Sequence, residues 1–590
     1  MKRLPLGTIS FTKLRNEDRY YIDKSPFIKV ALENDADVLL LTRPRRFGKT
    51  LFMDSLGCFL EIDSEFPGCS KKNAELFSGL KILEDKEFCS AYMGQFPVVS
   101  ISFKEIQDNN FWDAYQSFAS FVSIAAGRYN FLLESSRLDA NEKERLAKYQ
   151  SLDFASDIKN KSLIKTFLKD IIHFLGKHFD RKVIVLVDEY DVPLSKAAKY
   201  GYYEDMLPLI RGFLSDALKP NLGEASYLEK AVLTGCLRVG KESIFTDLNN
   251  FSLNTVVSED LDLSEAIGFT ASEVKELLCY YGLGNRFDDV QNWYDGYRFA
   301  GSEIYCPWDV INFCSHALIS KSPQTFTPKN YWINTSNNDI LEAFLGFLSG
   351  EETEKMQALL DGKTIEVTVN ETVSYDDLKR HDPNDFWTLL LFTGYLTIVD
   401  RSPQSSVKVR VRIPNEEIRQ TFKDKVIYRF SEKNGEFVNS GREIASALLA
   451  GNTSAFRLKL TKLLQNYVSI RDTATKSPAE NFYHGFLSAV FVSSGSFISN
   501  FHSNAEAGEG YADILFTSAD EEIGVVIEIK RCEKREDSIV LAEKALAQIK
   551  EKGYEQYFRG YPCKVIHAYG LVFFAKNCNV VMQSYKVKSN

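Results

Sequence analysis

The sequence lacks several features that would place the protein in a specialised class. No apolar run approaches the roughly 20 residues that a membrane-spanning helix needs. The opening residues, Met1 to Pro5, lead into no apolar segment of a secretory signal peptide. The ten cysteines form no C-x-x-C pair, and the seven histidines are equally dispersed, which gives little support to a zinc site. We therefore expect a cytoplasmic, reduced protein with no membrane partner.

An excess of positive charge is also missing. The net charge of −9 argues against a surface coated for nucleic acid, although it is compatible with a local basic groove. The hydrophobic content of 44% and the charged content of 26% are ordinary for a globular protein. Because 590 residues are too many for one hydrophobic core, we expect three or four domains.

A buried strand, a turn and the start of a helix organise the first part of the chain. Leu39 to Thr42 can fill a strand that is buried on both faces. Gly48-Lys49-Thr50 then matches the end of the phosphate-loop pattern G-x-x-x-x-G-K-[ST], although Arg43 stands at the first glycine place. The glycine lets backbone N–H groups approach a phosphate, the lysine reaches the terminal phosphates, and the threonine hydroxyl can bind Mg²⁺. The alternative is a chance Gly-Lys-Thr, which is common in long chains.

A second apolar strand, residues 182–187, ends in two carboxylates, which is the Walker B arrangement. Asp188 would hold the Mg²⁺ shell, and Glu189 would orient or deprotonate the attacking water. Two apolar strands that end in Gly-Lys-Thr and in Asp-Glu are much rarer by chance than either alone. Together they favour a nucleotide site.

Three short strings resemble one known family. Asp-Lys-Ser at 23–25, Arg-Pro-Arg-Arg-Phe-Gly-Lys-Thr at 43–50 and Asp-Glu-Tyr-Asp at 188–191 are similar to the bacterial AAA-ATPase-like family. Its members commonly carry a C-terminal nuclease-like domain of the PD-(D/E)XK superfamily, and the arginine at position 43 is that family's own form. The resemblance implies ATP and Mg²⁺ as cofactors. It also implies that residues 23–25 border the nucleotide, although helix capping explains them as well.

In ATPases of this class, the strand after Walker B often ends in a polar sensor near the terminal phosphate. The apolar strand 230–236 makes Thr234 and Arg238 our candidates, and the alternative is an ordinary strand end with an exposed arginine. The residues that we expect to bind the nucleotide are Arg43, Pro44, Arg45, Arg46, Phe47, Gly48, Lys49, Thr50, Asp188, Thr234 and Arg238, with Thr50 and Asp188 as metal ligands.

Two carboxylates and a lysine mark the C-terminal part. Residues 511–516 and 524–530 read as a strand pair joined by a polar turn. Glu528 and Lys530 are two apart, so both point to one face, where Asp513 of the partner strand could meet them. Asp513 and Glu528 would hold Mg²⁺ for phosphodiester hydrolysis, and Lys530 would position the nucleophile or stabilise the transition state. The alternative is a surface hairpin that carries these charges.

The PD-(D/E)XK resemblance adds two residues to this group. The superfamily often supplies another carboxylate from a preceding helix, which Glu480 matches. Gln548, on the predicted helix 540–549, resembles its auxiliary polar position. The residues that we expect to take part in catalysis are therefore Glu189, Glu480, Asp513, Glu528, Lys530 and Gln548.

These observations predict an α/β protein of four parts. An N-terminal P-loop NTPase core with a parallel sheet (1–255) would be followed by a helical lid (256–315) and a mixed helical and strand linker module (316–475). A restriction-endonuclease-like α/β domain (476–590) would end the chain.

The predicted function is ATP binding and hydrolysis together with metal-dependent cleavage of nucleic acid, DNA being favoured over RNA. Defence or mobile-element control is the biological role that the architecture and its resemblance imply. The alternative is a non-catalytic ATP-gated protein that binds nucleic acid or a partner through an inactive nuclease fold. A homo-oligomer is compatible with either function, because such ATPases often complete their site with a neighbour's arginine.

Overall fold

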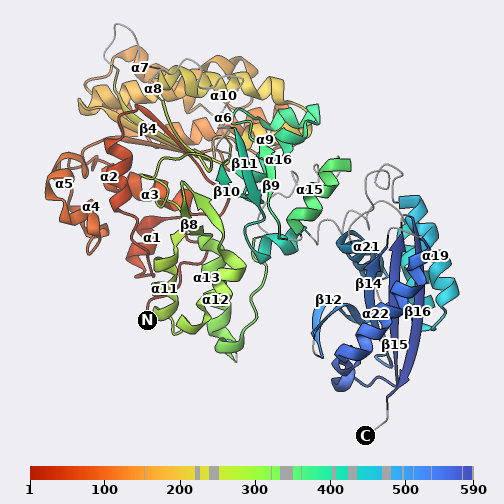
Figure 1. Cartoon of the computed structure of the whole chain (residues 1–590). Helices are drawn as coiled ribbons and strands as arrows, with labels where there is room; N and C mark the ends of the chain where they lie inside the picture. Colours follow the sequence, from red (N-terminus) through yellow and green to blue (C-terminus); the bar gives the residue numbers. More distant parts are fainter. Residues whose placement is uncertain are drawn as a thin grey trace. The chain divides into compact units, whose positions relative to one another are not determined.

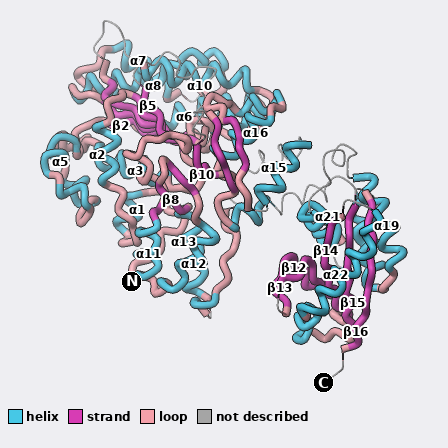
Figure 2. The backbone as a smooth tube through the Cα atoms, viewed as in Figure 1, coloured by secondary structure: helices cyan, strands magenta, loops and turns pink. Residues whose placement is uncertain are grey.

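The computed structural model describes residues 1–151, 153–219, 226–237, 251–320, 322–332, 350–360, 362–401, 407–422, 435–467, 480–494, 497–508, 510–532, 535–574 and 576–587. They divide into two compact units: residues 1–337 with 366–418, and residues 338–365 with 419–590. Figure 1 follows the chain through both units by colour, and Figure 2 distinguishes helices from strands. The four-part division expected from the sequence stays a prediction.

A parallel sheet forms the centre of the first unit. Its strands, in spatial order, are β2 (Val98–Ser102), β3 (Val183–Asp188), β4 (Leu228–Gly235), β1 (Val38–Thr42) and β5 (Phe251–Asn254). All neighbours pair in parallel, as expected of near-continuous apolar strands buried on both faces. The chain continues from β1 to β2 on one side of the sheet and reaches β5 on the other. Ligands of such sheets bind beyond the carboxyl ends of the strands, where the strand order reverses.

Helices cover both faces of this sheet (Figure 1). On one face, α6 (Phe111–Gly127), α8 (Lys161–Phe179) and α10 (Tyr203–Leu218) pack a large cluster of aliphatic and aromatic side chains against the strands. The aromatic side chains of these helices are therefore part of the core. α3 (Lys49–Leu60) lies against β3 and β2. The other helical segments here are α1 (Phe11–Asn16), α2 (Pro26–Glu33), α4 (Lys71–Leu76), η1 (Lys81–Glu84), α5 (Lys86–Tyr92), η2 (Asn130–Glu134), α7 (Ala140–Tyr149), η3 (Ile158–Asn160) and α9 (Val192–Tyr200).

The chain after β5 adds smaller elements to the first unit. They are β6 (Phe269–Thr270), α11 (Ala271–Tyr280), η4 (Gly284–Arg286), α12 (Phe287–Tyr294), β7 (Tyr297–Phe299), β8 (Ser302–Tyr305), α13 (Pro307–Ile319) and η5 (Pro323–Thr325). Because β6, β8 and β7 form an antiparallel sheet, the segment expected as a helical lid contains strands as well. Thr270 caps α11 in a capping box with Glu273. A further sheet follows, in the order β10 (Thr397–Arg401), β11 (Lys408–Arg412), β9 (Ile365–Thr368), with η6 (Tyr375–Arg380) and α16 (Pro383–Phe392).

The second unit is built on a mixed sheet. Its strands, in spatial order, are β12 (Ile498–Ala507), β13 (Gly510–Ser518), β14 (Ile523–Arg531), β15 (Val565–Phe574) and β16 (Asn577–Lys586). Only the β14–β15 pair is parallel among these described strands. α22 (Ser538–Lys552) crosses from β14 to β15, and α18 (Gly435–Leu449), α19 (Thr453–Tyr467) and α21 (Glu480–Ser493) share a core with the sheet. The remaining segments are α15 (Gly350–Leu360), η8 (Arg535–Asp537) and η9 (Tyr554–Gly560).

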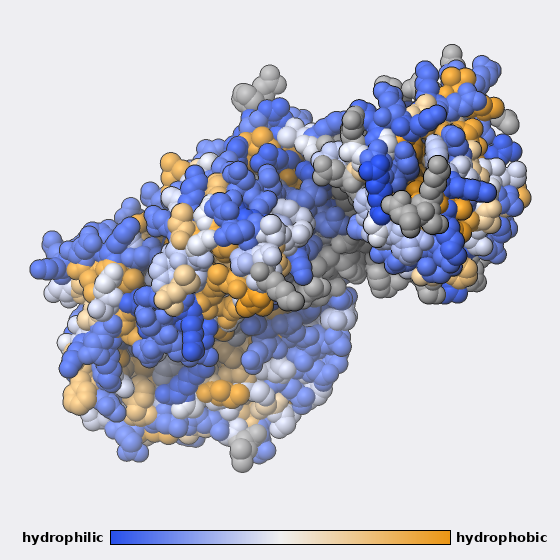
Figure 3. All heavy atoms as spheres, turned by 90° about the horizontal axis from the view of Figure 1, so that it is seen from below, coloured by the Kyte–Doolittle hydropathy of each residue, from blue (hydrophilic) through white to orange (hydrophobic). Residues whose placement is uncertain are grey.

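These two sheets confirm the predicted α/β fold class, with a parallel sheet first and a separate α/β sheet unit last. Among the residues that the structure describes, no helix combines the length and the apolar character needed to cross a bilayer. All ten cysteines lie within the described ranges and are free thiols. On the face seen in Figure 3, hydrophilic residues cover most of the surface, and hydrophobic residues show in scattered patches.

Candidate nucleotide-binding and nuclease sites

The loop between β1 and α3 forms the candidate phosphate site. Gly48 precedes the helix with a φ of 99°, a left-handed conformation that glycine adopts without steric cost. Lys49 is only 6% exposed, and its Nζ donates to the carbonyl oxygens of Arg43 and Pro44 at 2.9 Å each. The lysine therefore lies over its own loop at a helix N-terminus, where its positive charge can bind a phosphate.

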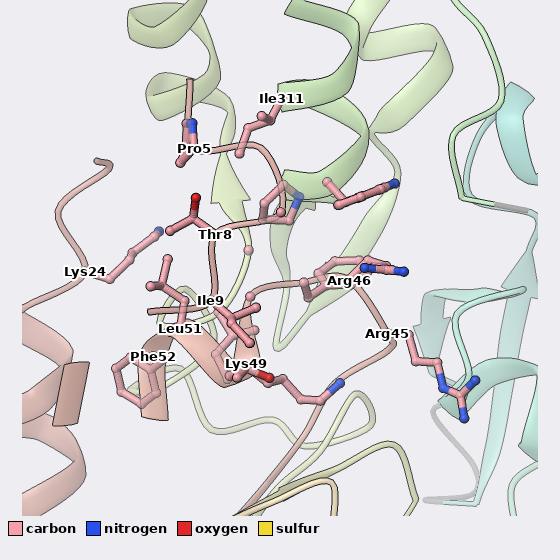
Figure 4. Close-up of a pocket in the computed structure, with 18 of the residues that line it drawn as sticks. Pro5, Thr8, Ile9, Lys24, Arg45, Arg46, Lys49, Leu51, Phe52 and Ile311 are labelled. Carbon is pink, nitrogen blue, oxygen red and sulfur yellow. The ribbon is translucent and has the colours of Figure 1, made fainter. Parts of the chain in front are cut away.

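A cavity of about 540 Å³ lies over this loop (Figure 4). Its wall includes every loop residue from Arg45 to Thr50. Lys24, Lys104 and Lys196 also line it, whereas Glu189 is the only carboxylate among the described lining residues. This excess of cationic side chains favours a polyanionic ligand. Four residues expected to bind nucleotide are not in the wall: Arg43, Pro44, Asp188 and Thr234.

Arg43 is a buried anchor of the loop. Its side chain is 1% exposed, and its guanidinium donates to the backbone oxygens of Thr42, Asn254 and Leu263 and to the Asn254 side chain, at 2.5 to 3.1 Å. Its Cζ also lies 4.7 Å from the ring centre of Phe299. Burial lowers the pKa of this arginine to about 9. Arg43 thus ties β1 to β5 and to the segment that follows β5, while its role in binding nucleotide stays a prediction.

Other loop residues contact the elements that follow β5. Phe47 is buried, with its ring centre 4.9 Å from that of Tyr297. Arg46 has a positive φ of 72°, and its guanidinium lies 4.3 Å from the ring centre of Trp308 on α13. Pro44 lies so close to Gly394 that a Cβ there would come within 2.7 Å of the proline Cβ. The loop is therefore held from outside the parallel sheet, by residues far away in the sequence.

Asp188 connects the two predicted halves of the nucleotide site. It ends β3, is 6% exposed, and accepts hydrogen bonds from two hydroxyls. Thr50 Oγ1 donates to its Oδ2 at 2.6 Å, and Thr234 Oγ1 donates to its Oδ1 at 2.5 Å. β4 lies between β1 and β3, which places Thr234 beside the carboxylate. The structure thus brings Thr50, Asp188 and Thr234 together, whereas Arg238 lies outside the described residues.

Glu189 and Asp191, both in the Asp-Glu-Tyr-Asp string, lie in different surroundings. Glu189 has a positive φ of 54° and lines the cavity, and burial raises its pKa above that of an ordinary glutamate. Asp191 is 2% exposed and accepts from the N–H groups of Cys236 and Leu237 and from the Tyr375 hydroxyl, at 3.0 to 3.1 Å. Glu189 therefore faces the cavity, its catalytic role staying a prediction, and Asp191 fixes the end of β4.

Arg45 faces these acidic groups. Its burial opposes the charged form, but Cys236, Tyr375, Asp191 and Glu189 outweigh that effect and raise the pKa of Arg45 above its usual value. The arginine is therefore a permanent cation in the wall of the cavity.

Sequence reasoning missed several residues of the cavity wall. Lys104 and Gln107 follow β2, and Lys196 lies on α9, which starts just after Asp191. The first two had a usable signal, since β2 neighbours β3 and its carboxyl end meets the same edge of the sheet. Pro5, Gly7, Thr8 and Ile9 had none, because nothing local in their sequence indicates that they face the phosphate loop.

In the second unit, Glu528 and Lys530 lie together on one strand face, as the sequence predicted, and Gln548 reaches the same glutamate. Glu528 is 2% exposed, and its Oε1 accepts from Lys530 Nζ at 2.7 Å and from Gln548 Nε2 at 2.5 Å. Glu528 is opposite Gly570 in the β14–β15 register. A Cβ at Gly570 would lie 2.0 Å from the Ala542 carbonyl oxygen, so the glycine allows α22 to approach and Gln548 to reach the glutamate.

Asp513 lies where β13 and β14 separate. The last paired residues of these strands are Ile514 and Ile527. Asp513 and Glu528 are the next residues beyond this pair, one on each strand. The Asp513 Oδ2 accepts the N–H of Ile529 at 2.7 Å, in place of a backbone partner. Burial raises the pKa of Asp513 above its usual range. His484 of α21 contacts the Asp513 carbonyl oxygen through Nε2 at 2.7 Å.

The donor sets fit Mg²⁺ at both sites. Thr50 and Asp188 offer a hydroxyl and a carboxylate within 2.6 Å of each other, and Asp513 and Glu528 offer two carboxylates at one strand fork. Across the described part of the chain, no group of three or more His, Cys, Asp and Glu side chains is placed to hold a metal. Glu480 begins α21, but its side chain lies outside the described residues, as does the predicted boundary between residues 475 and 476.

Comparison with known proteins finds two family models, one that matches residues within the first unit and one that matches residues within the second. Residues 5–245 match the family model described as predicted AAA-ATPase, and residues 478–583 match that of the PD-(D/E)XK nuclease superfamily. The chain is also 25% identical over 589 residues to a protein of Azotobacter chroococcum mcd 1 described as "Uncharacterized protein in vnfD 5'region". That similarity covers 98% of both chains.

Proposed function

Because the chain joins an AAA-ATPase-like region to a PD-(D/E)XK nuclease superfamily region, we propose that it hydrolyses ATP in the first unit and cleaves nucleic acid in the second. Both reactions would use Mg²⁺, and DNA is the favoured substrate. The observation that carries the proposal is Asp188, which accepts from the phosphate-loop Thr50 and from Thr234 on the neighbouring strand.

The first site supports ATP hydrolysis through groups with separate tasks. Lys49 would exchange its bonds to two loop carbonyl oxygens for bonds to the phosphates, and Thr50 with Asp188 would hold the ion. Mg²⁺, when bound, supplies positive charge to the phosphate oxygens. Glu189 accepts a hydrogen bond from the attacking water. The burial that raises its pKa also makes it a stronger base than an ordinary glutamate.

The second site supports phosphodiester cleavage through fewer groups. Lys530 lies 2.7 Å from a carboxylate oxygen of Glu528, so its charge is held at the position that a scissile phosphate would take beside the ligands. Gln548 fixes the orientation of Glu528 from α22. The bond from the Ile529 N–H holds the Asp513 carboxylate in one orientation, which supports its proposed role as the second ligand.

The test measures ATP hydrolysis and nucleic-acid cleavage on the same preparations, with Mg²⁺ present or chelated. We expect Lys49→Ala to weaken ATP binding and Glu189→Gln to keep binding but slow turnover. Glu528→Ala should abolish cleavage and leave ATP hydrolysis intact. Glu522→Ala is the matched control. This glutamate directly precedes β14, the strand that carries Glu528, and its exposed side chain pairs with Lys564.

Equal ATP binding and turnover in Lys49→Ala and in the parent would contradict the first half of the proposal. Cleavage by Glu528→Ala at the parent's rate would contradict the second half. If the parent hydrolyses ATP but cuts no DNA or RNA under any nucleotide condition, the second unit is a binding module.

A further inference from the structure

The chain leaves the first unit at two places. It passes to residues of the second unit after residue 337, returns at residue 366, and leaves again after residue 418. Trp332 is the last described residue before the first exit. A structural change beside these two exits therefore reaches both connections that lead out of the first unit.

One buried carboxyl group fastens the two exits together. Glu417 is the next-to-last residue before the second exit and is 0% exposed. Its Oε1 accepts the N–H groups of Tyr331 and Trp332, at 2.5 and 2.8 Å, just before the first exit. Asn330 Nδ2 also donates to the Glu417 carbonyl oxygen at 3.3 Å. We call Glu417 and these three residues the exit clamp.

A first set of contacts joins the phosphate loop to the exit clamp. The Arg46 guanidinium lies 4.3 Å from the ring centre of Trp308, and both residues line the cavity. Trp308 Nε1 donates to the Tyr331 carbonyl oxygen at 3.2 Å. The next residue, Asp309, shares a side-chain hydrogen bond with Glu417, so one of these two carboxyl groups carries the proton between them. α13 therefore reaches the clamp at two adjacent residues.

A second set of contacts starts two residues earlier in the loop. Pro44 lies against Gly394, where a Cβ would come within 2.7 Å of the proline Cβ. Tyr395 follows this glycine, and its ring centre lies 4.9 Å from that of Trp332, edge to face. Pro44, Tyr395 and Trp332 are all buried. Two short series of contacts from the phosphate loop thus end on Tyr331 and Trp332, which are neighbours in the chain.

We propose that the exit clamp couples nucleotide binding in the first unit to cleavage by the second. Arg46 lines the cavity, so a phosphate bound there competes with the Trp308 ring for the guanidinium. Once Arg46 binds the phosphate, Trp308 holds Tyr331 less firmly, and the two N–H groups separate from Glu417. The nucleotide then binds the released clamp more tightly than the closed one, which is the condition for coupling. This coupling rests on the proposed function, because it needs a nucleotide at one site and cleavage at the other.

The contact that is exchanged sets the size of the effect. A cation–π contact at a partly exposed site shifts an equilibrium about two- to fivefold. The contact between Arg46 and Trp308 is of this kind. The cleavage rate should therefore differ about two- to fivefold between saturating nucleotide and none.

The first experiment follows amide hydrogen exchange of the full chain, with Mg²⁺ and with or without a saturating non-hydrolysable ATP analogue. Glu417 protects the N–H groups of Tyr331 and Trp332, so the analogue should speed exchange in residues 330–332 about two- to fivefold. Trp308→Phe keeps a ring for Arg46 but lacks the N–H that donates to Tyr331, so the gain should be absent. The Kd of the analogue is measured for each variant, which keeps every comparison at saturation.

The second experiment measures DNA cleavage and analogue binding in two variants of the clamp. Glu417→Leu removes the acceptor of both N–H groups, so exchange should be fast without nucleotide and the cleavage rate should not respond to it. Because coupling is reciprocal, this variant should also bind the analogue about two- to fivefold more tightly than the parent does. Glu417→Gln is the matched control, since its amide keeps an acceptor for the N–H groups and a donor for Asp309.

The outcomes separate the coupling from the proposed function. Analogue binding with unchanged exchange in residues 330–332, or faster exchange with an unchanged cleavage rate, would overturn the coupling alone. Weaker analogue binding by Glu417→Leu would show that Glu417 only supports the site, and would overturn the coupling as well. Absence of nucleotide binding or of cleavage in the parent would overturn the proposed function, and the coupling with it.

Discussion

Thr234 offers a sharp test of the nucleotide site, because its hydroxyl can be removed with almost no change in shape. The side chain is 0% exposed and donates to Asp188 Oδ1 at 2.5 Å. Thr234→Val replaces the hydroxyl with a methyl group and leaves Asp188 with Thr50 as its other hydroxyl donor. If the Thr50 hydroxyl binds Mg²⁺ instead of Asp188, the valine variant would have neither of these two hydroxyls to hold the Asp188 carboxylate in place.

The size of the effect follows from the type of bond. A hydrogen bond to a charged group contributes about 1.5–3 kcal/mol. If that free energy orients Asp188 for the ion, its loss should raise the Mg²⁺ concentration for half-maximal ATP hydrolysis by about 10- to 100-fold. The assay is a Mg²⁺ titration of ATP turnover at saturating ATP.

Thr234→Ser is the control, because it keeps the hydroxyl and loses only a methyl group. It should stay close to the parent in its Mg²⁺ dependence. A valine variant with the parent's Mg²⁺ dependence would refute the assigned role of Thr234. A serine variant as impaired as the valine variant would show that packing, and not the hydroxyl, matters at this position.

Three further predictions address pH, packing and the second site. The pKa of Glu189 is raised, mainly by burial, so the acidic limb of the ATP turnover profile should lie above the range of an ordinary glutamate, and Glu189→Gln should remove that limb from its residual activity. Gly570→Ala would put a Cβ 2.0 Å from the Ala542 carbonyl oxygen, so it should destabilise the second unit by about 1–3 kcal/mol in urea unfolding and abolish cleavage while ATP hydrolysis persists. Burial raises the pKa of Asp309 to about 6 from 3.8, so its contribution to stability is fully present below about pH 4 and is lost as the pH rises through 6. The stability of Asp309→Asn relative to the parent should therefore rise between pH 5 and pH 8, and a fall would contradict the argument.

Much of the fold could be predicted from local pattern. The apolar runs that became β1, β3 and β4 were visible in the sequence, because a strand buried on both faces needs an unbroken apolar stretch. The hairpin of β13 and β14 and the helix α22 were equally visible. The strands β6 to β8 inside the expected helical lid were not, since strands of two to four residues leave little periodicity to detect.

The candidate sites divide in the same way. The sequence alone determined the chemical groups: Lys49 and Thr50 at a helix start, Asp188 at a strand end, and Glu528 with Lys530 on one strand face. These depend on spacing within a single element, which the backbone geometry of strands and helices fixes.

Only the tertiary structure decided how those groups are held and what surrounds them. Arg43 could be a phosphate ligand in the sequence, yet its guanidinium is bound to the backbone oxygens of Asn254 and Leu263. Lys24 faces the same cavity as Lys49, which only the family resemblance of residues 23–25 had implied, because no local pattern in the 24 residues between the two lysines brings them together. Such placements depend on contacts between residues far apart in the chain. These contacts stabilise the fold only after the sheet has assembled and water has been excluded from them.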